Sequence, residues 1–404
     1  MLWTQRLKVT RSRSKLVENK MIVIAIAVLS LSVWLFLLLF WGDFWQAKQR
    51  VESSLKLEAC PRVWAIVPAR DEAEAIAISL TSLLNQNYQG KLSITLVDDN
   101  SSDRTSEIAL ATAAQLGKSD RLKVITGKPL ESGWKGKLWA MYQGIEYAQA
   151  QIPAPDYFLF TDADIKHAPD NLTQLIAKAE TENLDLVSLM VLLRCQSFWE
   201  KLLIPAFVFF FQKLYPFSWV NDWHKSMAAA AGGCILISNE ALVEMGGIAT
   251  IKDALIDDCS LAKAVKSQGK NIWLGLSETT ISLRGYDNLK VIWDTIARTA
   301  YTQLNYSPLL LIGTTIAMVI VYLIAPVGVT WGLVTSNWLV FSICVITWLL
   351  MIWAYVPTLR LYKISWAWAG LLPAIAFLYT LMTIDSAIKY YQGKGGAWKG
   401  RTYD

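Results

Sequence analysis

The chain has 404 residues, of which 54% are hydrophobic, and it contains 19 tryptophans. Its mean hydropathy of +0.33 indicates a membrane protein that carries a soluble domain. The net charge of +5 is modest and comes partly from the two ends of the chain, so it does not indicate nucleic acid as a partner. The five cysteines show no Cys-x-x-Cys spacing, which argues against a zinc site and a disulfide framework.

Four apolar runs predict membrane helices. Residues 1–20 form a basic tail, and residues 21–41 are an uncharged run about as long as a bilayer is thick. A cleaved signal peptide is the alternative, but this run is too long and lacks a small-residue cleavage site, so we expect an anchor. About three further helices are expected within residues 307–388, from the apolar runs 309–329, 338–356 and 366–384, which have Trp and Tyr at their ends.

Between a linker at 42–59 and the C-terminal helices, residues 60–306 alternate between strand and helix patterns. The expected strands are 63–67, 92–97, 122–126 and 157–160, and the expected helices are 72–85, 105–116 and 136–148. This alternation predicts an α/β domain with a mostly parallel sheet and helices on both faces. Ligands of such sheets bind beyond the carboxyl ends of the strands.

Asp162 and Asp164 follow the strand 157–160 directly. In an extended backbone, residues i and i+2 lie on the same face, so both carboxylates can converge on one hard cation. A divalent ion held in this way keeps open positions for the oxygens of a diphosphate. The alternative is a solvated turn with two Asp side chains.

Two other polar clusters come at strand ends. Pro68, Arg70 and Glu72 follow the first strand, and Asp98 with Asp99 follows the second. One of the two aspartates can contact a base or ribose while the other caps the next segment, although plain turn chemistry is the alternative. Three polar clusters at three strand ends favour a nucleotide site.

Neither a Rossmann dinucleotide fingerprint nor a P-loop follows these strands. Phosphates are therefore expected to be held by the metal and by Lys135 or Lys137, which lead into a helix whose free N–H groups favour an anion. Either lysine can equally well be solvated.

Asp257 and Asp258 enter an apolar helix that Gly269 is expected to end. Each can be a simple N-cap, but two adjacent acids also allow one to cap while the other points into the cleft as a general base. Gly232 and Gly233 would allow backbone or substrate to approach closely.

These segments resemble a known family. Val67-Pro-Ala-Arg-Asp-Glu72, Val97-Asp-Asp-Asn-Ser101, Thr161-Asp-Ala-Asp164 and Ile256-Asp-Asp-Cys-Ser-Leu261 occur in the order seen in glycosyltransferase family 2, which has the GT-A fold. Residues 197–211 and 300–308 further resemble the hopanoid-biosynthesis-associated group of glycosyltransferases.

The resemblance implies roles for individual residues. Pro68, Arg70 and Glu72 match the first nucleotide-contacting loop, and Asp99, with Asp98, matches the base and ribose contact. Asp162 and Lys137 are the further expected donor contacts, Lys137 from its position before a helix. Asp162 and Asp164 match the site for Mg²⁺ or Mn²⁺, and Asp258 matches the base of inverting members. The Gln-x-x-Arg-Trp motif of processive members is absent, with only Arg298-Thr299 near its place, so a single transfer is expected.

The expected acceptor is a membrane lipid, and the resemblance suggests a hopanoid or isoprenoid type. The aromatic segment 198–220 is interrupted by charges and is expected to lie at the membrane interface beside the active site. A buried helix of the α/β domain is the alternative. In the basic tail 389–404, Trp398 and Arg401 can touch the donor site or lipid headgroups, with solvated charge as the alternative.

Nucleotide sugars are cytosolic, so the domain is expected to face the cytoplasm from a plasma or inner membrane. One helix before the domain and three after it would place both basic tails outside, against the positive-inside rule. We therefore expect at least one apolar segment to be interfacial or re-entrant. A catalytically inactive scaffold is the main alternative function. A transporter or sensor is disfavoured because 309–329 and 338–356 contain no charged residue.

Overall fold

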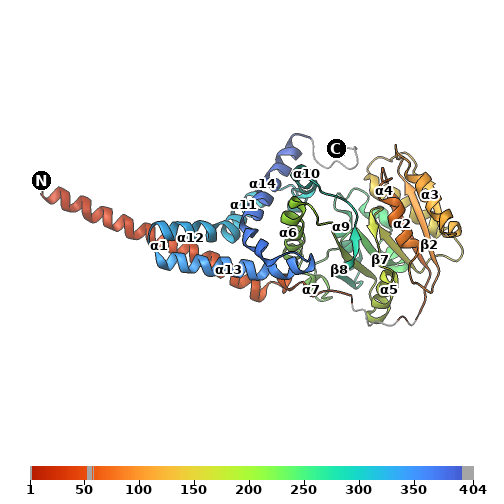
Figure 1. Ribbon diagram of the computed structural model, residues 1–404, viewed down its shortest axis with the longest axis horizontal. Helices are drawn as coiled ribbons and strands as arrows, with labels where there is room; N and C mark the ends of the chain where they lie inside the picture. The colour runs from red at the N-terminus through yellow and green to blue at the C-terminus, as the bar shows by residue number, and fades with distance from the viewer. Residues whose placement is uncertain (1, 52–56, 58, 394–404) are drawn as a thin grey trace.

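The computed structural model describes residues 2–51, 57 and 59–393, with side chains from residue 20 onward. Helix α1 (Leu2–Phe40) leads into an α/β domain, which is followed by a group of C-terminal helices (Figure 1). The predicted class of fold is therefore confirmed.

The domain contains an eight-stranded sheet in the order β3-β2-β1-β4-β7-β6-β8-β5. Its strands are β1 (Val63–Ala69), β2 (Leu92–Asp98), β3 (Leu122–Thr126), β4 (Tyr157–Thr161), β5 (Ile165–Lys166), β6 (Leu186–Leu192), β7 (Cys234–Ser238) and β8 (Ile272–Ser282). Strands β1 to β4 are parallel, as predicted. Strand β7 runs antiparallel to β4 and pairs Cys234 with Thr161. This pairing brings the start of β7, and so Gly233, beside the end of β4 and Asp162.

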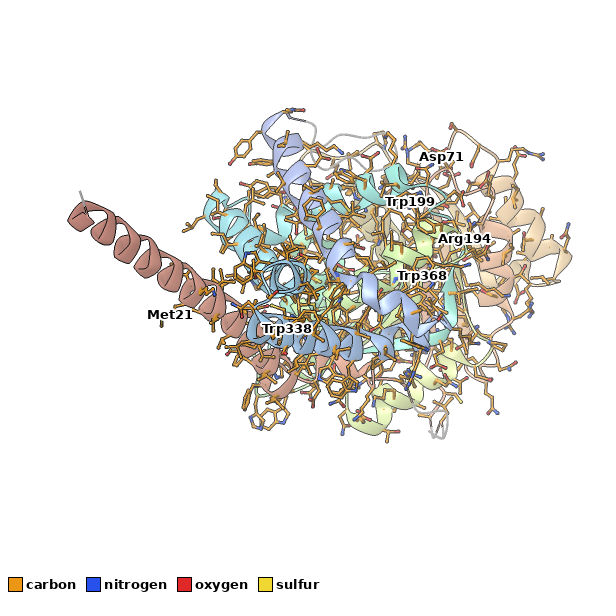
Figure 2. The ribbon with its side chains drawn as sticks, turned by 60° about the vertical axis from the view of Figure 1, so that its left-hand side comes forward. Met21, Asp71, Arg194, Trp199, Trp338 and Trp368 are labelled. Atoms are coloured by element: carbon orange, nitrogen blue, oxygen red, sulfur yellow. The ribbon has the colours of Figure 1, made fainter. Side chains whose placement is uncertain are left out.

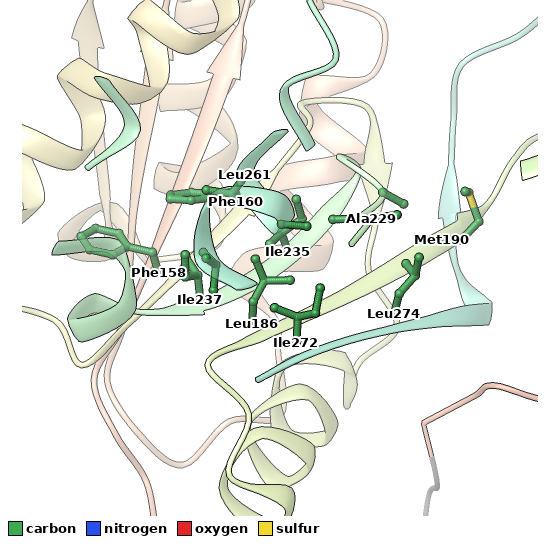
Figure 3. Packing of buried hydrophobic residues seen from close by; sticks show 14 of the residues in the cluster. Phe158, Phe160, Leu186, Met190, Ala229, Ile235, Ile237, Leu261, Ile272 and Leu274 are labelled. Carbon is green, nitrogen blue, oxygen red and sulfur yellow. The ribbon is translucent and has the colours of Figure 1, made fainter. Parts of the chain in front are cut away.

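Alternating strand residues bury the two faces of the sheet separately. Phe158 and Phe160 pack in one core and Leu159 in the other, as the two-residue period of a strand requires. The first core is covered by α4 (Gly136–Gln149), α6 (Phe198–Leu214) and α9 (Asp257–Ser267), and Leu261 of α9 meets Phe160 and Ile235 in Figure 3. Helices α2 (Ile76–Leu84), α3 (Thr105–Gln115) and α5 (Asn171–Glu182) cover the second.

Four helical segments among the described residues are long and apolar enough to cross a membrane: Lys20–Phe40, Pro308–Val334, Trp338–Leu361 and Trp366–Tyr391. The second is not one regular helix. It consists of α11 (Pro308–Met318), a π-helical turn (Val319–Leu323) and α12 (Ile324–Val334). Pro326 has no N–H to bond the carbonyl four residues earlier, which accounts for the irregular turn.

Helix α1 satisfies carbonyl groups of this π-helical turn. Ser30 Oγ donates to the carbonyl of Ile320 at 2.8 Å, and Trp34 Nε1 donates to that of Val321 at 2.6 Å. Because polar groups have no water partner in a hydrocarbon layer, these bonds hold α1 against the C-terminal helices.

Helix α14 (Leu372–Tyr391) is oriented differently from α12 and α13 (Trp338–Leu361). In both views it runs across them (Figure 1, Figure 2). Just before its start, the ring of Trp368 lies beside that of Phe198 of α6, with the two ring centroids 5.6 Å apart. At its end, Tyr391 Oη lies 3.1 Å from Tyr301 Oη of the α/β domain. A helix of 20 residues is about 30 Å long, and both ends of this one contact the domain.

Helix α6, within the segment 198–220, is buried between the α/β domain and the C-terminal helices. Ile204 and Val208 pack in the first core of the domain, while Leu203 and Phe209 pack with Tyr355 and the other residues of the membrane helices. The proposal that this segment lies at the membrane interface therefore concerns a helix covered on both sides and stays a prediction.

Glu200, in the first turn of α6, is fully buried. Its carboxylate accepts hydrogen bonds from the backbone N–H groups of Gln196, Ser197 and Tyr286 at 2.7 to 2.8 Å. Burial favours the neutral form, but these donors outweigh it and lower the pKa of Glu200. The start of α6 is thereby joined to the loop that follows β8.

Candidate active site

The two loops expected to contact the nucleotide interlock at the ends of β1 and β2. Arg70 donates to the backbone carbonyl of Asp99 at 2.9 Å, and its guanidinium lies 3.4 Å from the Asp99 carboxylate. The N–H of Glu72 donates to Thr105 Oγ1 at 2.9 Å. Asp99 is 1% exposed, so these contacts fix the floor of a cleft that Pro68, Arg70 and Glu72 line.

The carboxylate of Asp98 binds groups of the protein itself. Its carboxylate accepts from the N–H of Ser101 at 2.8 Å and from the hydroxyl of Ser106. The division of labour expected for the pair therefore places the capping role on Asp98. Asp99, whose carboxylate faces Arg70, remains the residue predicted to contact a base or ribose.

Lys137, in the first turn of α4, connects three elements. Its ammonium lies 2.9 Å from Asp162 after β4 and 3.0 Å from Asp257 at the start of α9. Burial opposes the charge, but the two carboxylates outweigh it and raise the pKa of the Lys137 ammonium. Of the two candidate lysines, Lys137 makes these ion pairs, while Lys135 lines the same cleft one residue before α4.

Asp258 points into the same cleft. Its two carboxylate oxygens accept from the N–H of Gly232 at 2.9 Å and from that of Cys259 at 2.7 Å. Burial, followed by repulsion from Asp257, raises the pKa of Asp258 to about 6. A base whose pKa lies slightly below neutral is deprotonated at pH 7 and can still accept a proton.

Among the alternatives for Asp257 and Asp258, a side-chain N-cap at the start of α9 is not seen in the structure. The N-cap residue of α9 is Ile256, which has no capping side chain, and both Asp257 and Asp258 face the cleft. The reason is that Lys137 attracts Asp257 while Gly232 leaves room for Asp258. A Cβ atom at Gly232 would lie 3.2 Å from Lys137 Nζ and 3.4 Å from Asp258 Oδ2. Gly233 instead faces Val191 and Ile165.

Asp164 lies deeper than Asp162 and is 9% exposed. Burial, and then the negative charges of Asp162 and Glu72, raise the pKa of Asp164 to about 6. These carboxylates repel one another when both are charged, and a bound divalent cation would relieve that repulsion. Hard divalent cations also prefer oxygen ligands. No ready-made group of three or more metal-binding side chains occurs among the described residues. The chemistry of this donor set nevertheless fits a cation that takes further oxygens from a bound diphosphate.

Two arginines complete the polar wall of the cleft. Arg298, expected near this place, lines it together with Arg284, which the sequence reasoning missed. Within the part of the chain that the structure describes, neither guanidinium forms an ion pair. Burial, and then repulsion from Arg284, lower the pKa of Arg298. Arg284 lies two residues after the end of β8, so the strand-end rule applied to that strand would have found it.

The opposite wall is apolar and comes from α6. Phe207 and Phe211 line the cleft, which encloses about 300 Å³, together with Tyr286 and Met190. Carboxylates, cations and an aromatic surface therefore meet in one space. Trp398 and Arg401, which were expected to reach this site or the headgroups, lie outside the described residues.

Comparison with known proteins identifies the domain. Residues 64–246 match the family model described as glycosyl transferase family 2. The chain is 29% identical over 131 residues to 4,4'-diaponeurosporenoate glycosyltransferase of Staphylococcus haemolyticus, covering 31% of this chain and 32% of that protein. It is 31% identical over 145 residues to beta-monoglucosyldiacylglycerol synthase of Trichormus variabilis, covering 35% and 29%. The chain thus spans about a third of the length of each relative.

Among solved structures, the chain is similar to the mannosyltransferase PcManGT from Pyrobaculum calidifontis in complex with GDP-Man and Mn²⁺. The TM-score is 0.53 at 17% identity, covering 91% of this chain and 99% of that one. At this identity the likeness concerns the fold. The chain carries a glycosyl transferase family 2 domain over residues 64–246, and its α/β domain has the GT-A fold.

Proposed function

We propose that this protein is a membrane-bound glycosyltransferase that moves a single sugar from a nucleotide-sugar donor to a lipid acceptor. The observation that carries the proposal is the composition of one cleft. Asp162, Asp164 and Asp258 share it with Lys137 and the two arginines, and α6 supplies an aromatic wall that continues into the membrane helices.

The donor is held at the ends of β1, β2 and β4. Asp99 and the loop from Pro68 to Glu72 receive the nucleoside, while Lys137, Arg284 and Arg298 offer positive charge to the diphosphate. Asp162 and Asp164 would hold the divalent cation, Mg²⁺ or Mn²⁺. When bound, the cation offsets the negative charge of the leaving nucleoside diphosphate. PcManGT, whose fold this chain shares, is described in complex with both GDP-Man and Mn²⁺.

Asp258 acts on the acceptor. Its carboxylate takes the proton of an acceptor hydroxyl while that oxygen forms a bond to the anomeric carbon of the sugar. The bond from this carbon to the diphosphate oxygen breaks at the same time, so the configuration inverts. The N–H groups of Gly232 and Cys259 fix the orientation of the carboxylate. General-base help of this kind is typically worth about 10²- to 10⁴-fold in rate.

A lipid acceptor is supported by the position of the cleft and by the relatives. Beta-monoglucosyldiacylglycerol synthase is named for a glycosylated diacylglycerol product, and 4,4'-diaponeurosporenoate glycosyltransferase for its acceptor. The resemblance to the hopanoid-associated group adds hopanoids as candidate acceptors.

The domain is proposed to face the cytoplasm, where nucleotide sugars occur. In this arrangement α1 and the pair α12–α13 cross the membrane, while α14 lies along its cytoplasmic side because both of its ends contact the domain. The basic C-terminal residues then lie inside, as the positive-inside rule requires. The basic N-terminal residues lie on the opposite side, against that rule.

The test uses the full chain in lipid nanodiscs with a panel of radiolabelled nucleotide sugars, Mn²⁺ and extracted membrane lipids. Wild-type protein should label a lipid with one donor, and Asp164→Asn should reduce labelling to background. Asp170→Asn, at an exposed position before α5, is the matched control and should retain activity. Donor binding without transfer to any lipid would favour the inactive scaffold.

A further inference from the structure

A second cavity adjoins the catalytic cleft. It encloses about 1090 Å³ between the start of α9, the segment from α10 (Leu289–Thr299) to Tyr306, and the end of α14. Lys135, Ala254, Leu255 and Arg298 line both spaces. The cavity therefore begins beside the residues that carry Asp258, and it is more than three times as large as the cleft.

Tyrosines dominate the walls of this cavity. We call it the tyrosine vestibule and define it by Tyr215, Tyr301, Tyr306, Tyr390 and Tyr391. The rings of Tyr306 and Tyr390 stack with centroids 4.5 Å apart. The hydroxyl of Tyr301 lies 3.1 Å from that of Tyr391 and donates to the carbonyl of Tyr306 at 2.8 Å. These contacts fix the end of α14 against the α/β domain.

Most other polar groups of the vestibule are neutral. Thr302, Gln303, Asn305, Ser260 and Ser386 contribute hydroxyls and amides. Such groups can both donate and accept hydrogen bonds, and aromatic rings offer flat apolar faces. A sugar-like ring that carries hydroxyl groups can hydrogen-bond to such side chains and stack on such rings.

The charged residues of the vestibule do not single out an anion. Lys135 and Arg298 also line the donor cleft, and the two charged residues that line the vestibule alone, Lys263 and Asp253, are exposed and opposite in sign. The largely neutral lining is therefore the feature that distinguishes this space from the cleft, whose walls carry five carboxylates and five cations.

One face of α6 connects the vestibule with the cleft. Phe207, Phe211 and Tyr215 follow one another at four-residue spacing, so they share a helix face. Their ring centroids are 6.5 Å and 5.3 Å apart in turn. Tyr215 donates to Gln303 at 2.8 Å, which places the end of this stripe inside the vestibule.

The apolar surface next to the vestibule belongs to the membrane part. Helix α11, which begins shortly after Tyr306, has no buried residue and exposes Leu309, Leu310, Ile312 and Ile316. A lipid tail can lie along this surface while its headgroup occupies the vestibule.

We infer that the tyrosine vestibule binds the neutral, polyhydroxylated headgroup of a membrane lipid and presents one of its hydroxyls to Asp258. The inference rests on the proposed function and makes it more specific, because it assigns the acceptor a glycosyl or polyol headgroup larger than a single hydroxyl. The size of the cavity and its lining of rings, hydroxyls and amides carry it.

The experiment uses an octyl glucoside that carries a diazirine near the glycosidic oxygen, with the full chain in nanodiscs. After irradiation, crosslinks should map by mass spectrometry to residues 301–306 and 386–393. Unlabelled octyl glucoside should reduce this labelling at least fivefold at a concentration where octyl phosphate has no effect. Equal competition by octyl phosphate would overturn the assignment of a neutral headgroup, and labelling confined to other segments would overturn the site.

A matched pair of variants on α9 sharpens the test. Ser260 lines the vestibule, whereas Ser267 is exposed at the other end of the helix. Ser260→Trp should fill part of the cavity and lower labelling at least fivefold, and Ser267→Trp should retain it. If Ser260→Trp fails to fold, the competition in wild type decides the question.

This labelling needs no donor. A protein that is labelled as expected but uses no nucleotide sugar would contradict the proposed function and leave the headgroup site standing. One that transfers sugar but is not labelled would contradict only the vestibule.

Discussion

The ammonium nitrogen of Lys137 lies 3.0 Å from a carboxylate oxygen of Asp257, so the first turns of α4 and α9 meet across the cleft. The same ammonium lies 2.9 Å from Asp162 after β4. One cation therefore balances two carboxylates beside the proposed diphosphate and base. The arrangement predicts separate effects for the residues involved.

Replacing the cation should affect both stability and donor binding. In Lys137→Met, Asp162 and Asp257 lose their shared partner, and a lost charged hydrogen bond at a partly buried site costs about 1–3 kcal/mol. We expect a lower thermal unfolding midpoint in detergent and at least a tenfold higher Kd for the nucleotide sugar. Lys128→Met, at an exposed position, is the control. Unchanged donor affinity would contradict a role of Lys137 at the diphosphate.

Replacing the two aspartates of α9 should change different kinetic quantities. Asp258→Asn keeps the shape of the side chain but cannot take a proton, so turnover should fall about 10²-fold or more while donor Kd stays near the wild-type value. Asp257→Asn removes one partner of Lys137 and should mainly change donor Kd. Both quantities can be measured by steady-state kinetics and equilibrium binding. Equal losses of turnover in the two variants would exclude Asp258 as the distinct base.

The pH dependence of turnover should report Asp258. Burial and repulsion from Asp257 raise its pKa to about 6, and a general base works only when deprotonated. Turnover should therefore fall tenfold per pH unit below about pH 6 and level off above it. The measurement requires saturating Mn²⁺, because Asp164 also titrates near pH 6 without a cation. Constant turnover down to pH 4.5 would rule out this assignment.

The orientation of α14 can be tested by introducing one cysteine at a time into a Cys60→Ser background. Cys60 is the exposed native cysteine among the described residues. Gln392→Cys follows α14, and Thr335→Cys lies at the α12–α13 turn, away from the sheet (Figure 1). In inverted vesicles, a membrane-impermeant maleimide should label Gln392→Cys together with a domain reporter, Ser102→Cys. Thr335→Cys should react only in right-side-out cells. Labelling of Gln392→Cys from outside would show that α14 crosses the membrane.

Local patterns predicted the first half of the domain well. Strands β1 to β4 alternate with helices, so their ends and the residues after them could be placed without knowledge of distant contacts. The direction of β7 could not be predicted, because Cys234–Ser238 is a short apolar run that reads the same in either orientation. The position of Asp257 depends on Lys137, and that of α14 depends on Tyr301 and Trp368. These contacts join residues far apart in sequence, so periodicity contains no information about them.

The burial of α6 has a practical consequence for protein engineering. A fragment of residues 60–306 would keep the sheet and the cleft but would uncover Leu203 and Phe209, which now pack against Tyr355 and Tyr379. The same cut would remove the hydroxyl of Tyr379 from the carbonyl of Leu203, 2.9 Å away. Glu200 joins α6 to the loop that carries Arg284. A fragment whose α6 is displaced should therefore both aggregate and lose the correct position of Arg284 in the cleft. Soluble expression of the catalytic half would therefore require a redesigned outer face of α6, with polar residues in place of the aromatic ones.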